Sequence, residues 1–355
     1  MVPRTFMEVF SMFQRHGGDV FTYPGILDLS ANLSPLGMPE SVKKAVRECA
    51  DSCAQYPDPL CRGLREKLSI HEDHPAEKIV CGNGADDLIY RAVHSICPAR
   101  AVIAVPCFSE YEKALSETGC DIIRHLLRED EDFLPGPDIL DALTADVDML
   151  MLCTPNNPTG QLIPPELLSA VARRCEENDI VFLCDECFIG FAENGEEYSL
   201  KRNMNSKTIV LRAFTKLYAM AGLRLGYALC GSSSLAEKLR DSGQYWSVSA
   251  PAQAGGEAAL SETDYPRRAA ETVAGERRYL TEELASAGFK VYPSSANYIL
   301  FRAGEGLAER LLKEGIMIRC CGNYAGLDGT FYRTAVRRRQ DSEQLLKALR
   351  RCING

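Results

Sequence analysis

Short apolar runs alternate with longer helix-like stretches between residues 78 and 229 of this chain. Runs that are apolar throughout are typical of strands buried on both faces, as in parallel sheets covered by helices. One intervening stretch, 163–177, opens with Pro164 and Pro165, and proline suits the first turn of a helix. The alternation therefore predicts an α/β fold built on a large, mostly parallel sheet. The expected strands are 78–81, 101–105, 149–153, 181–184 and 208–211.

The pattern changes after residue 246. Residues 252–288 predict helices, and four short strand-like runs follow, which together predict a smaller α+β domain. A chain of 355 residues is long enough to form one large and one small domain. We therefore expect a large domain over 41–245 and a small C-terminal domain over 246–355. The four strand-like runs are 290–292, 298–301, 316–319 and 331–336.

Composition excludes several classes of protein. A formal net charge of −9 argues against a nucleic-acid partner, because such binding depends on a basic surface. The N-terminus lacks the apolar segment of a signal peptide, and no apolar run approaches the roughly 20 residues that a membrane helix needs. We expect the fifteen cysteines to be reduced thiols of a cytoplasmic protein. A lone C-x-x-C pair, Cys184 and Cys187, is too little for a metal site, and we expect none.

Polar residues follow three of the predicted strands near the point where each strand ends. Asn157, Asp185 and Lys216 each come shortly after one of these apolar runs. In an open parallel sheet, ligands bind at the carboxyl ends of the strands. We therefore expect the amide, the carboxylate and the amine to converge on one pocket.

These side chains form a chemically coherent set. A lysine amine can form a Schiff base with an aldehyde, so Lys216 could carry an aldehyde cofactor. Asp185 could keep a pyridine nitrogen protonated, and Asn157 could donate a hydrogen bond to a ring phenolate oxygen. Arg224, which lies eight residues after Lys216 among glycines, could bind a phosphate. A lysine and an arginine alone would more often indicate a solvated loop. The polar residues Asn157 and Asp185 after the other two strands make a functional site the better interpretation.

In this order and spacing, the segments resemble the fold-type I pyridoxal-phosphate enzymes of the aspartate aminotransferase superfamily (class I and II). The resemblance covers nearly the whole chain and implies pyridoxal 5′-phosphate as the cofactor. It implies the fold of these transferases, with a seven-stranded, mostly parallel sheet and a smaller α+β domain that the segment 1–40 joins. It also implies a homodimer in which Tyr56 reaches the cofactor phosphate of the second subunit.

The same resemblance assigns the cofactor contacts. The loop 82–87 precedes a helix-like stretch, and free N–H groups at a helix start bind phosphate well; an ordinary glycine turn with an aspartate cap is the alternative. Phe108 falls where the family stacks an aromatic ring on the cofactor. Ala213 departs from the family, because relatives often carry Ser or Thr there. The expected cofactor-binding residues are Gly84, Ala85, Asp86, Phe108, Asn157, Asp185, Thr215, Lys216, Arg224 and, from the second subunit, Tyr56.

Both ends of the chain resemble the threonine-phosphate decarboxylases, which make aminopropanol phosphate for cobalamin biosynthesis. The histidinol-phosphate aminotransferases are the nearest competitor. Phe188 favours the decarboxylases, because the aminotransferases usually place a tyrosine there. The stretch 246–249 is also similar to the decarboxylases, although its last residue, Ser249, is usually Asn in them. The segments that carry the resemblance are 16–19, 27–37, 318–328 and 332–337.

This closer resemblance implies a phosphorylated amino acid as the substrate. Arg333 and Arg337 are candidates for its anionic groups, because residues at i and i+4 of a strand face the same side; a solvated basic edge is the alternative. His16 is a candidate phosphate contact, although a histidine beside glycines near a terminus is about as often a surface residue. The expected substrate contacts are His16, Asn32, Asn157, Tyr324, Arg333 and Arg337.

Three functions stay open at this point. The bond at Cα that breaks is the one held perpendicular to the cofactor ring, where orbital overlap is largest. A perpendicular carboxylate gives decarboxylation of L-threonine O-3-phosphate, whereas a perpendicular C–H bond gives transamination of histidinol phosphate or another amino acid, with Lys216 as the base. A non-catalytic regulator that binds the cofactor is disfavoured, because the expected catalytic residues Lys216, Asp185 and Asn157 are all present.

Overall fold

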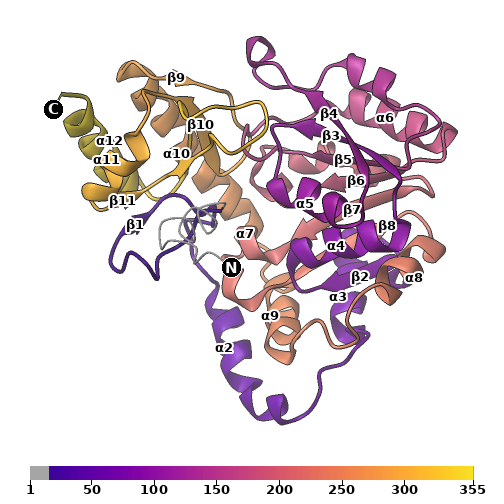
Figure 1. The fold of residues 1–355 in the computed structure, drawn as a ribbon. Coiled ribbons are helices and arrows are strands. Elements are labelled where there is room, and N and C mark those ends of the chain that lie inside the picture. The colour runs from indigo at the N-terminus through magenta and orange to yellow at the C-terminus, as the bar shows by residue number, and fades with distance from the viewer. Residues whose placement is uncertain (1–15, 355) are drawn as a thin grey trace, which may run out of the picture.

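The computed structural model describes residues 16–354, so residues 1–15 of the predicted N-terminal segment lie outside it. Its largest element is a seven-stranded sheet in the order β2-β8-β7-β6-β5-β3-β4 (Figure 1). All its pairings are parallel except those of β8, which is antiparallel to both β2 and β7. The strands are β2 (Ile79–Gly82), β3 (Arg100–Val105), β4 (Asp121–Leu126), β5 (Met149–Cys153), β6 (Val181–Asp185), β7 (Thr208–Ala213) and β8 (Gly226–Cys230).

The predicted fold class is confirmed, and the five predicted strands of the large sheet all exist. Two further strands were not predicted. Strand β4 lies at the sheet edge and mixes charged with apolar residues, so it lacks the wholly apolar run of a buried strand. Strand β8 begins at Gly226, directly after the glycine-rich segment around Arg224, and that segment reads as a loop. Hydrophobic patterning therefore identified five strands, including β2 at one edge, but missed the mixed edge strand β4 and the interior strand β8.

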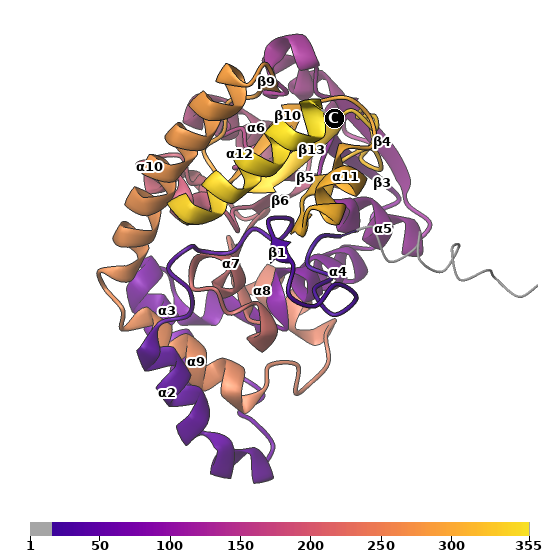
Figure 2. The same cartoon turned by 90° about the vertical axis from the view of Figure 1, so that its left-hand side faces the viewer.

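Helices cover both faces of the large sheet, as Figures 1 and 2 show. One face packs against α4 (Gly84–Ile96), α5 (Ser109–Glu117) and α8 (Ser233–Asp241). The opposite face packs against α6 (Pro165–Glu177) and α3 (Arg62–Glu72) in a core that continues into the C-terminal part of the chain. Burial on both faces explains why the central strands are apolar throughout.

The C-terminal part contains a second, antiparallel sheet in the order β12-β13-β10-β9. A long helix, α10 (Tyr265–Ser286), runs beside α12 (Arg339–Asn354) on this sheet (Figure 2). The strand β1 (Leu27–Asp28) pairs in parallel with β11 (Ile316–Met317), so the N-terminal segment is attached here. The remaining elements are β9 (Lys290–Val291), β10 (Tyr298–Arg302), α11 (Leu307–Lys313), β12 (Arg319–Cys320) and β13 (Phe331–Ala335).

The helix α9 (Ala250–Leu260) lies just after the predicted domain boundary at residue 246, in the part assigned to the small domain. It packs against α2 (Glu40–Glu48) and α3, away from the antiparallel sheet (Figure 1). We therefore propose that α9 belongs with the large domain and that the small domain begins at α10. Short 3₁₀ turns complete the chain, at Ala50–Ala54, Ala76–Lys78, Glu129–Glu131, Pro137–Ala142, Ile189–Phe191, Gly195–Glu197, Leu200–Asn203 and Ala221–Leu223.

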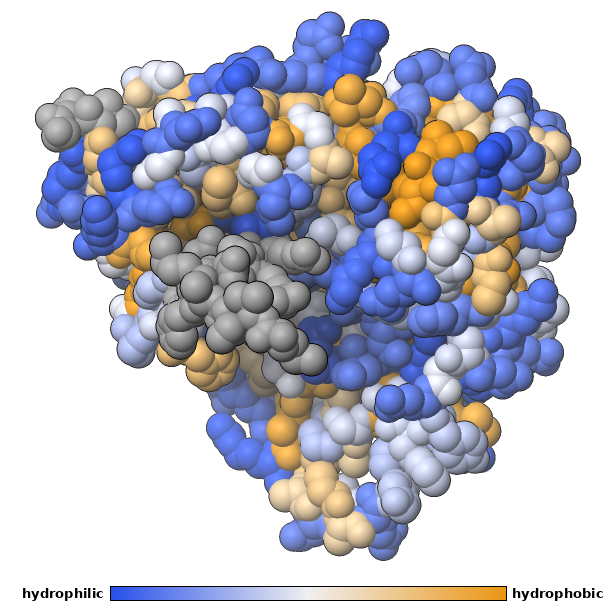
Figure 3. All heavy atoms as spheres, viewed as in Figure 1, coloured by the Kyte–Doolittle hydropathy of each residue, from blue (hydrophilic) through white to orange (hydrophobic). Residues whose placement is uncertain are grey.

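The surface of the molecule is mostly polar on the side drawn in Figure 3, where hydrophobic side chains form only small groups. Among residues 16–354, no helix combines the length and the apolar character that crossing a bilayer requires.

Candidate active site

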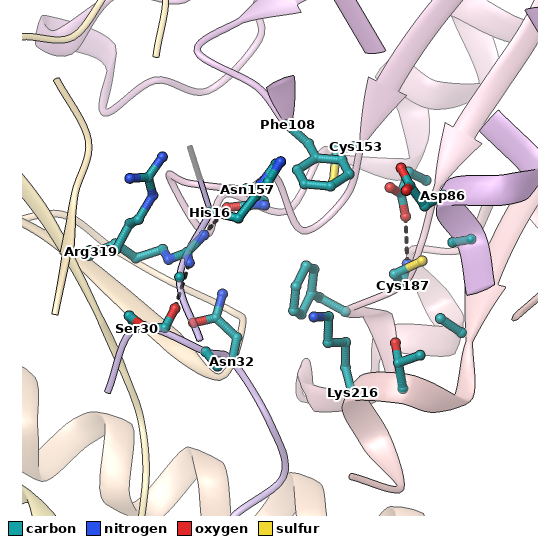
Figure 4. Close-up of a pocket in the computed structure, with 18 of the residues that line it drawn as sticks. His16, Ser30, Asn32, Asp86, Phe108, Cys153, Asn157, Cys187, Lys216 and Arg319 are labelled. Carbon is teal, nitrogen blue, oxygen red and sulfur yellow. Dashed lines mark hydrogen bonds between the residues drawn. The ribbon is translucent and has the colours of Figure 1, made fainter. Parts of the chain in front are cut away.

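The three polar residues that follow the apolar strands converge on one cavity. Strands β5, β6 and β7 are neighbours and run in parallel, so their carboxyl ends lie at the same edge of the sheet. Asn157 follows β5, Asp185 is the last residue of β6, and Lys216 lies in the one-turn helix α7 (Phe214–Leu217) after β7. All three line a cavity of about 230 Å³ between the two sheets (Figure 4).

Lys216 is prepared for nucleophilic chemistry. Burial and the nearby charge of Arg333 lower the pKa of the Lys216 amine to about 8. A lysine of this kind presents a much larger fraction of neutral amine near pH 8 than an exposed lysine does. The backbone N–H of Ser34 donates to the carbonyl of Lys216 at 3.0 Å, so the N-terminal segment also fixes this turn.

The carboxylate of Asp185 is held by two donors. The hydroxyl of Tyr111 donates to Oδ2 at 2.6 Å, and the backbone N–H of Cys187 donates to Oδ1 at 2.9 Å. Burial and the charge of Asp185 raise the pKa of Tyr111 well above its usual value, so the tyrosine stays a neutral donor. Asp185 is thus oriented as a fixed negative charge at the cavity floor, which suits a partner that is cationic when protonated.

One end of the cavity is built to receive an anion. Helix α4 begins at Gly84, whose φ is +86°, and a Cβ at this position would lie 2.7 Å from Nη2 of Arg224. The guanidinium of Arg224 therefore lies directly against the start of α4, where backbone N–H groups are free to bind an anion. Ala85 and Thr215 line the cavity beside it.

Asp86 adds an unusual feature to this end of the cavity. Its Oδ1 is buried and has no hydrogen-bond partner within residues 16–354. Burial and the charge of Glu110 raise the pKa of Asp86 above its usual value. Buried side-chain oxygens usually have a hydrogen-bond partner, so this oxygen is available to a donor that enters the cavity.

Aromatic and small side chains form the other walls. Phe108, at the start of α5, and Phe188 line the cavity together with Cys153, Cys187 and Ala213. Phe188 packs edge-to-face on Tyr298, with ring centroids 5.0 Å apart. These walls can take up a planar ring between them.

The small domain supplies Arg333 from β13. Its Nη1 donates to Oδ1 of Asn157, and its Nη2 donates to the carbonyl of Ser30 at 2.9 Å. Its Nε is buried with no partner in the described part of the chain. Arg333 therefore connects the side-chain amide of Asn157 to the N-terminal segment, and its Nε remains available to a ligand.

Arg319 is a second cationic residue of the cavity, and the sequence analysis missed it. It lies on β12 directly opposite Arg333 on β13, and its Nη2 donates to Oδ1 of Asn323 at 2.7 Å. Like charges directly opposite each other destabilise a strand pair unless an anion lies close to both. In the sequence, Arg319 is recognisable only as the arginine that ends the apolar run 316–319. Its position opposite Arg333 follows from the strand register.

The N-terminal segment closes the cavity. Asn32 is buried, and its Oδ1 has no partner in the described residues, while Tyr324 reaches the cavity from the loop after β12. His16 lines the same cavity, and its Nε2 lies 2.8 Å from Oε1 of Glu110. Figure 4 shows His16, Asn32 and Arg319 on the side of the cavity opposite Asp86.

Two predicted site residues lie outside this cavity. Strand β13 ends at Ala335, so the strand alternation that predicted Arg333 and Arg337 on one side does not reach Arg337. Arg337 lines a separate pocket, and its Nη1 donates to the carbonyl of Leu33 at 3.4 Å. The expectation that the two arginines share a site was therefore wrong in its geometry. Tyr56 is 77% exposed and stacks on Trp246, with ring centroids 4.3 Å apart.

Across residues 16–354, no group of three or more His, Cys, Asp or Glu side chains has an arrangement that could hold a metal ion.

Comparison with known proteins defines the class. The profile of the family "Aminotransferase class I and II" matches residues 24–351. The chain is 40% identical over 352 residues to the threonine-phosphate decarboxylase of Salmonella typhimurium, which covers 96% of this chain and 97% of that protein. The chain therefore belongs to the class I and II aminotransferase family, whose cofactor is pyridoxal 5′-phosphate.

Solved structures show the same fold. The histidinol-phosphate aminotransferase from Clostridium acetobutylicum matches with a TM-score of 0.86 and 30% identity, covering 93% of this chain and 99% of that chain. The histidinol-phosphate aminotransferase from Sinorhizobium meliloti, in complex with pyridoxal-5′-phosphate, matches with a TM-score of 0.82 and 24% identity, covering 91% of this chain and 90% of that chain.

The cavity fits this cofactor. The junction of Gly84 with Arg224 at the start of α4 suits its phosphate. The fixed carboxylate of Asp185 suits its ring nitrogen, and the amine of Lys216, with its lowered pKa, suits its aldehyde.

Proposed function

We propose that the chain decarboxylates L-threonine O-3-phosphate to aminopropanol phosphate, a reaction of cobalamin biosynthesis. The observation that carries this proposal is the cross-strand pair of Arg319 and Arg333 at the cavity. Three anions need a partner in such a reaction: the cofactor phosphate, the substrate carboxylate and the substrate phosphate. Arg224 suits the first of these, and the Arg319–Arg333 pair supplies fixed positive charge for the other two.

The proposed cofactor contacts follow from the cavity. Arg224, Thr215 and the start of α4, which comprises Gly84, Ala85 and Asp86, would bind the phosphate. Phe108 would pack on the ring, Asn157 would donate to the ring oxygen, and the amine of Lys216 would hold the aldehyde. Asp185 would accept from the ring nitrogen, and its hydrogen bond from Tyr111 at 2.6 Å keeps its carboxylate in place. When bound, pyridoxal 5′-phosphate supplies an electron sink for the pair released as a bond at Cα breaks.

The residues around the substrate decide which bond breaks. We propose that Arg333 would bind the substrate carboxylate and fix its orientation at the cavity, which would select loss of CO₂ over the other reactions at Cα. Arg319, His16, Asn32 and Tyr324 bind the phosphate at the other end of the substrate. Cα then needs a proton, and the Nζ of Lys216 is the donor that the cavity places nearby, with a pKa of about 8.

A second candidate is an aminotransferase for histidinol phosphate or another amino acid. The similarity in fold and sequence to a histidinol-phosphate aminotransferase favours it. In this reaction Lys216 would remove the proton of Cα instead of supplying one. Phe188 argues against it, because a phenylalanine has no hydroxyl with which to bind the ring oxygen of the cofactor.

One experiment separates the two reactions. Purified holoenzyme is mixed with threonine phosphate or histidinol phosphate in the absence of a keto acid, and CO₂ and cofactor absorbance are recorded. Decarboxylation releases CO₂ through many turnovers and returns the cofactor to its aldehyde form. Transamination converts the cofactor to its amine form after a single turnover and releases no CO₂, and this result with threonine phosphate would refute the proposal.

We also propose that the enzyme is a homodimer. Tyr56 and Trp246 form an exposed stacked aromatic pair outside the cavity of their own chain. Such a pair supports docking on a second copy, in which the Tyr56 hydroxyl would reach the cofactor phosphate. We propose a cytoplasmic location as well, which the fifteen free thiols support because a reducing compartment keeps cysteines unpaired.

A further inference from the structure

A nearly buried carboxylate stands behind His16. Glu110, in the first turn of α5, is 7% exposed, and its Oε1 lies 2.8 Å from Nε2 of His16. The mechanism proposed above does not use this carboxylate. Among the described contacts, Glu110 can act on the cavity only through His16, which lines the cavity.

The second oxygen of Glu110 is also occupied. The hydroxyl of Tyr90 donates to Oε2 at 2.8 Å, and the ammonium of Lys113 lies 3.5 Å from the same oxygen. Burial alone would raise the pKa of Glu110, but the hydrogen bonds from Tyr90 and His16 outweigh burial and lower it. Glu110 is therefore ionised at neutral pH, and its two oxygens are fixed by partners on both sides.

An ionised carboxylate at Nε2 decides what the other ring nitrogen can do. A neutral histidine that donates from Nε2 has a lone pair on Nδ1, and a lone pair repels an anion. A protonated histidine donates from both nitrogens, so it can bridge a carboxylate and a phosphate. The ring is also packed against Phe108, with centroids 5.7 Å apart, which limits its rotation.

Other charged groups lie beside Glu110 or line the cavity. Lys113 is on the same helix as Glu110, while Asp86, Arg224 and Arg319 reach the cavity from other elements. The negative charge next to the imidazole comes from Glu110, because Glu110 is the carboxylate that bonds to it among the described contacts. Glu110 is thus the residue that can fix the position of the His16 ring.

We propose that Glu110 is a positioning residue that holds the His16 ring at the cavity as a contact for the phosphate of the substrate. This inference rests on the proposed function, since it assigns a phosphate-bearing substrate to the site. It explains how His16, whose side chain is 47% exposed, can contribute to selectivity: the partner that orients it is a buried residue of α5. The selectivity concerned is for a phosphorylated amino acid over the same amino acid without phosphate.

The test compares Glu110→Gln with Glu112→Gln in the holoenzyme. Glu112 is a matched control, because it lies on the same helix but pairs with Arg124. Glu110→Gln keeps the shape and an acceptor oxygen but removes the charge. It should raise the KM for threonine phosphate about tenfold, the typical effect of losing one charge-assisted contact, with kcat within about twofold of the wild type. Glu112→Gln should leave both constants unchanged.

A double-mutant cycle with His16→Gln shows whether Glu110 acts through the histidine. In the His16→Gln background, Glu110→Gln should raise the KM no further, because the orienting partner then has nothing to orient. A separate tenfold increase in that background would overturn the proposal, as would a fall in kcat with an unchanged KM. If Glu110→Gln does not fold, Tyr90→Phe, which releases the other carboxylate oxygen, enters the same cycle and should give a smaller increase.

Binding without turnover separates this inference from the proposed function. Borohydride reduction locks the cofactor onto Lys216, and calorimetry then measures the affinity for threonine phosphate alone. The reduced Glu110→Gln enzyme should bind about tenfold more weakly than the reduced wild type, and equal affinities would overturn the positioning role. A wild type that binds threonine phosphate in this way but never releases CO₂ would refute the proposed reaction and leave the role of Glu110 supported.

Discussion

Arg212 and Glu186 form a buried ion pair, with 3.1 Å between Nη2 and Oε2, in a pocket separate from the one that Asp185 lines. Glu186 directly follows Asp185, and Arg212 lies four residues before Lys216. The guanidinium also donates to Glu196 at 2.7 Å and to Glu72 at 3.2 Å. The pair therefore ties together the ends of β6 and β7, the two strands that present the carboxylate and the amine to the cavity.

Arg212→Met should destabilise the protein strongly, because it leaves the buried carboxylate of Glu186 without its cationic partner. Removing one member of a buried pair typically costs about 3–5 kcal/mol in the free energy of unfolding. Urea unfolding of the cofactor-free protein measures this change. Arg267→Met is the control, because Arg267 pairs with Glu271 on the surface and should leave the unfolding midpoint unchanged. Equal midpoints for both variants would contradict the prediction.

The rate at which cofactor-free protein captures pyridoxal 5′-phosphate should depend on pH through Lys216. The pKa of this amine is lowered to about 8, and only its neutral form attacks an aldehyde. The rate should therefore rise about tenfold per pH unit below 8 and level off above it. Stopped-flow absorbance measures the rate, and a free lysine amine is the reference, because its rate keeps rising to about pH 10. A protein whose rate also rises to pH 10 would show that Lys216 is not perturbed.

Asp185→Asn should slow turnover by at least about a hundredfold, because a neutral amide cannot keep the ring nitrogen of the cofactor protonated. Cofactor content, measured by absorbance after denaturation, should stay near one per chain. Tyr111→Phe is the graded control: it removes one hydrogen bond to Asp185 but keeps the charge, so it should cost only about tenfold. A near-normal rate for Asp185→Asn would refute the role given to this carboxylate.

Tyr56→Phe should weaken cofactor binding about tenfold by removing one hydroxyl contact to the phosphate across the dimer. Equilibrium dialysis measures the affinity, and sedimentation should show a dimer for both the wild type and the variant. Tyr245→Phe is the control, because Tyr245 is 66% exposed and packs on Trp246 in the same aromatic group but has no assigned contact. An active monomer, or equal effects of both substitutions, would contradict the assignment.

The sequence predicted the half of the cavity whose residues directly follow strands of the large sheet. Asn157, Asp185 and Lys216 each follow a buried apolar strand, and parallel strands bring their carboxyl ends together without further information. The substrate half depends on long-range register, which patterning cannot supply. Arg319 became a site residue only because β12 pairs with β13 in a register that sets it opposite Arg333, and Arg337 dropped out because β13 ends at Ala335. The contact of His16 with Glu110 spans 94 residues and carries no local signal.

The bond from Arg333 to the carbonyl of Ser30 joins residues 303 positions apart. The backbone N–H of Ala335 likewise donates to the carbonyl of Leu29 at 2.7 Å, and β1 pairs with β11. During synthesis on a ribosome, the lysine, the aspartate and the phosphate loop emerge long before these C-terminal strands. A nascent chain can thus complete the large sheet before β1 and Ser30 have their C-terminal partners. The proposed substrate contacts would therefore be the last part of the cavity to form, after the strands that carry Arg319 and Arg333 have left the exit tunnel.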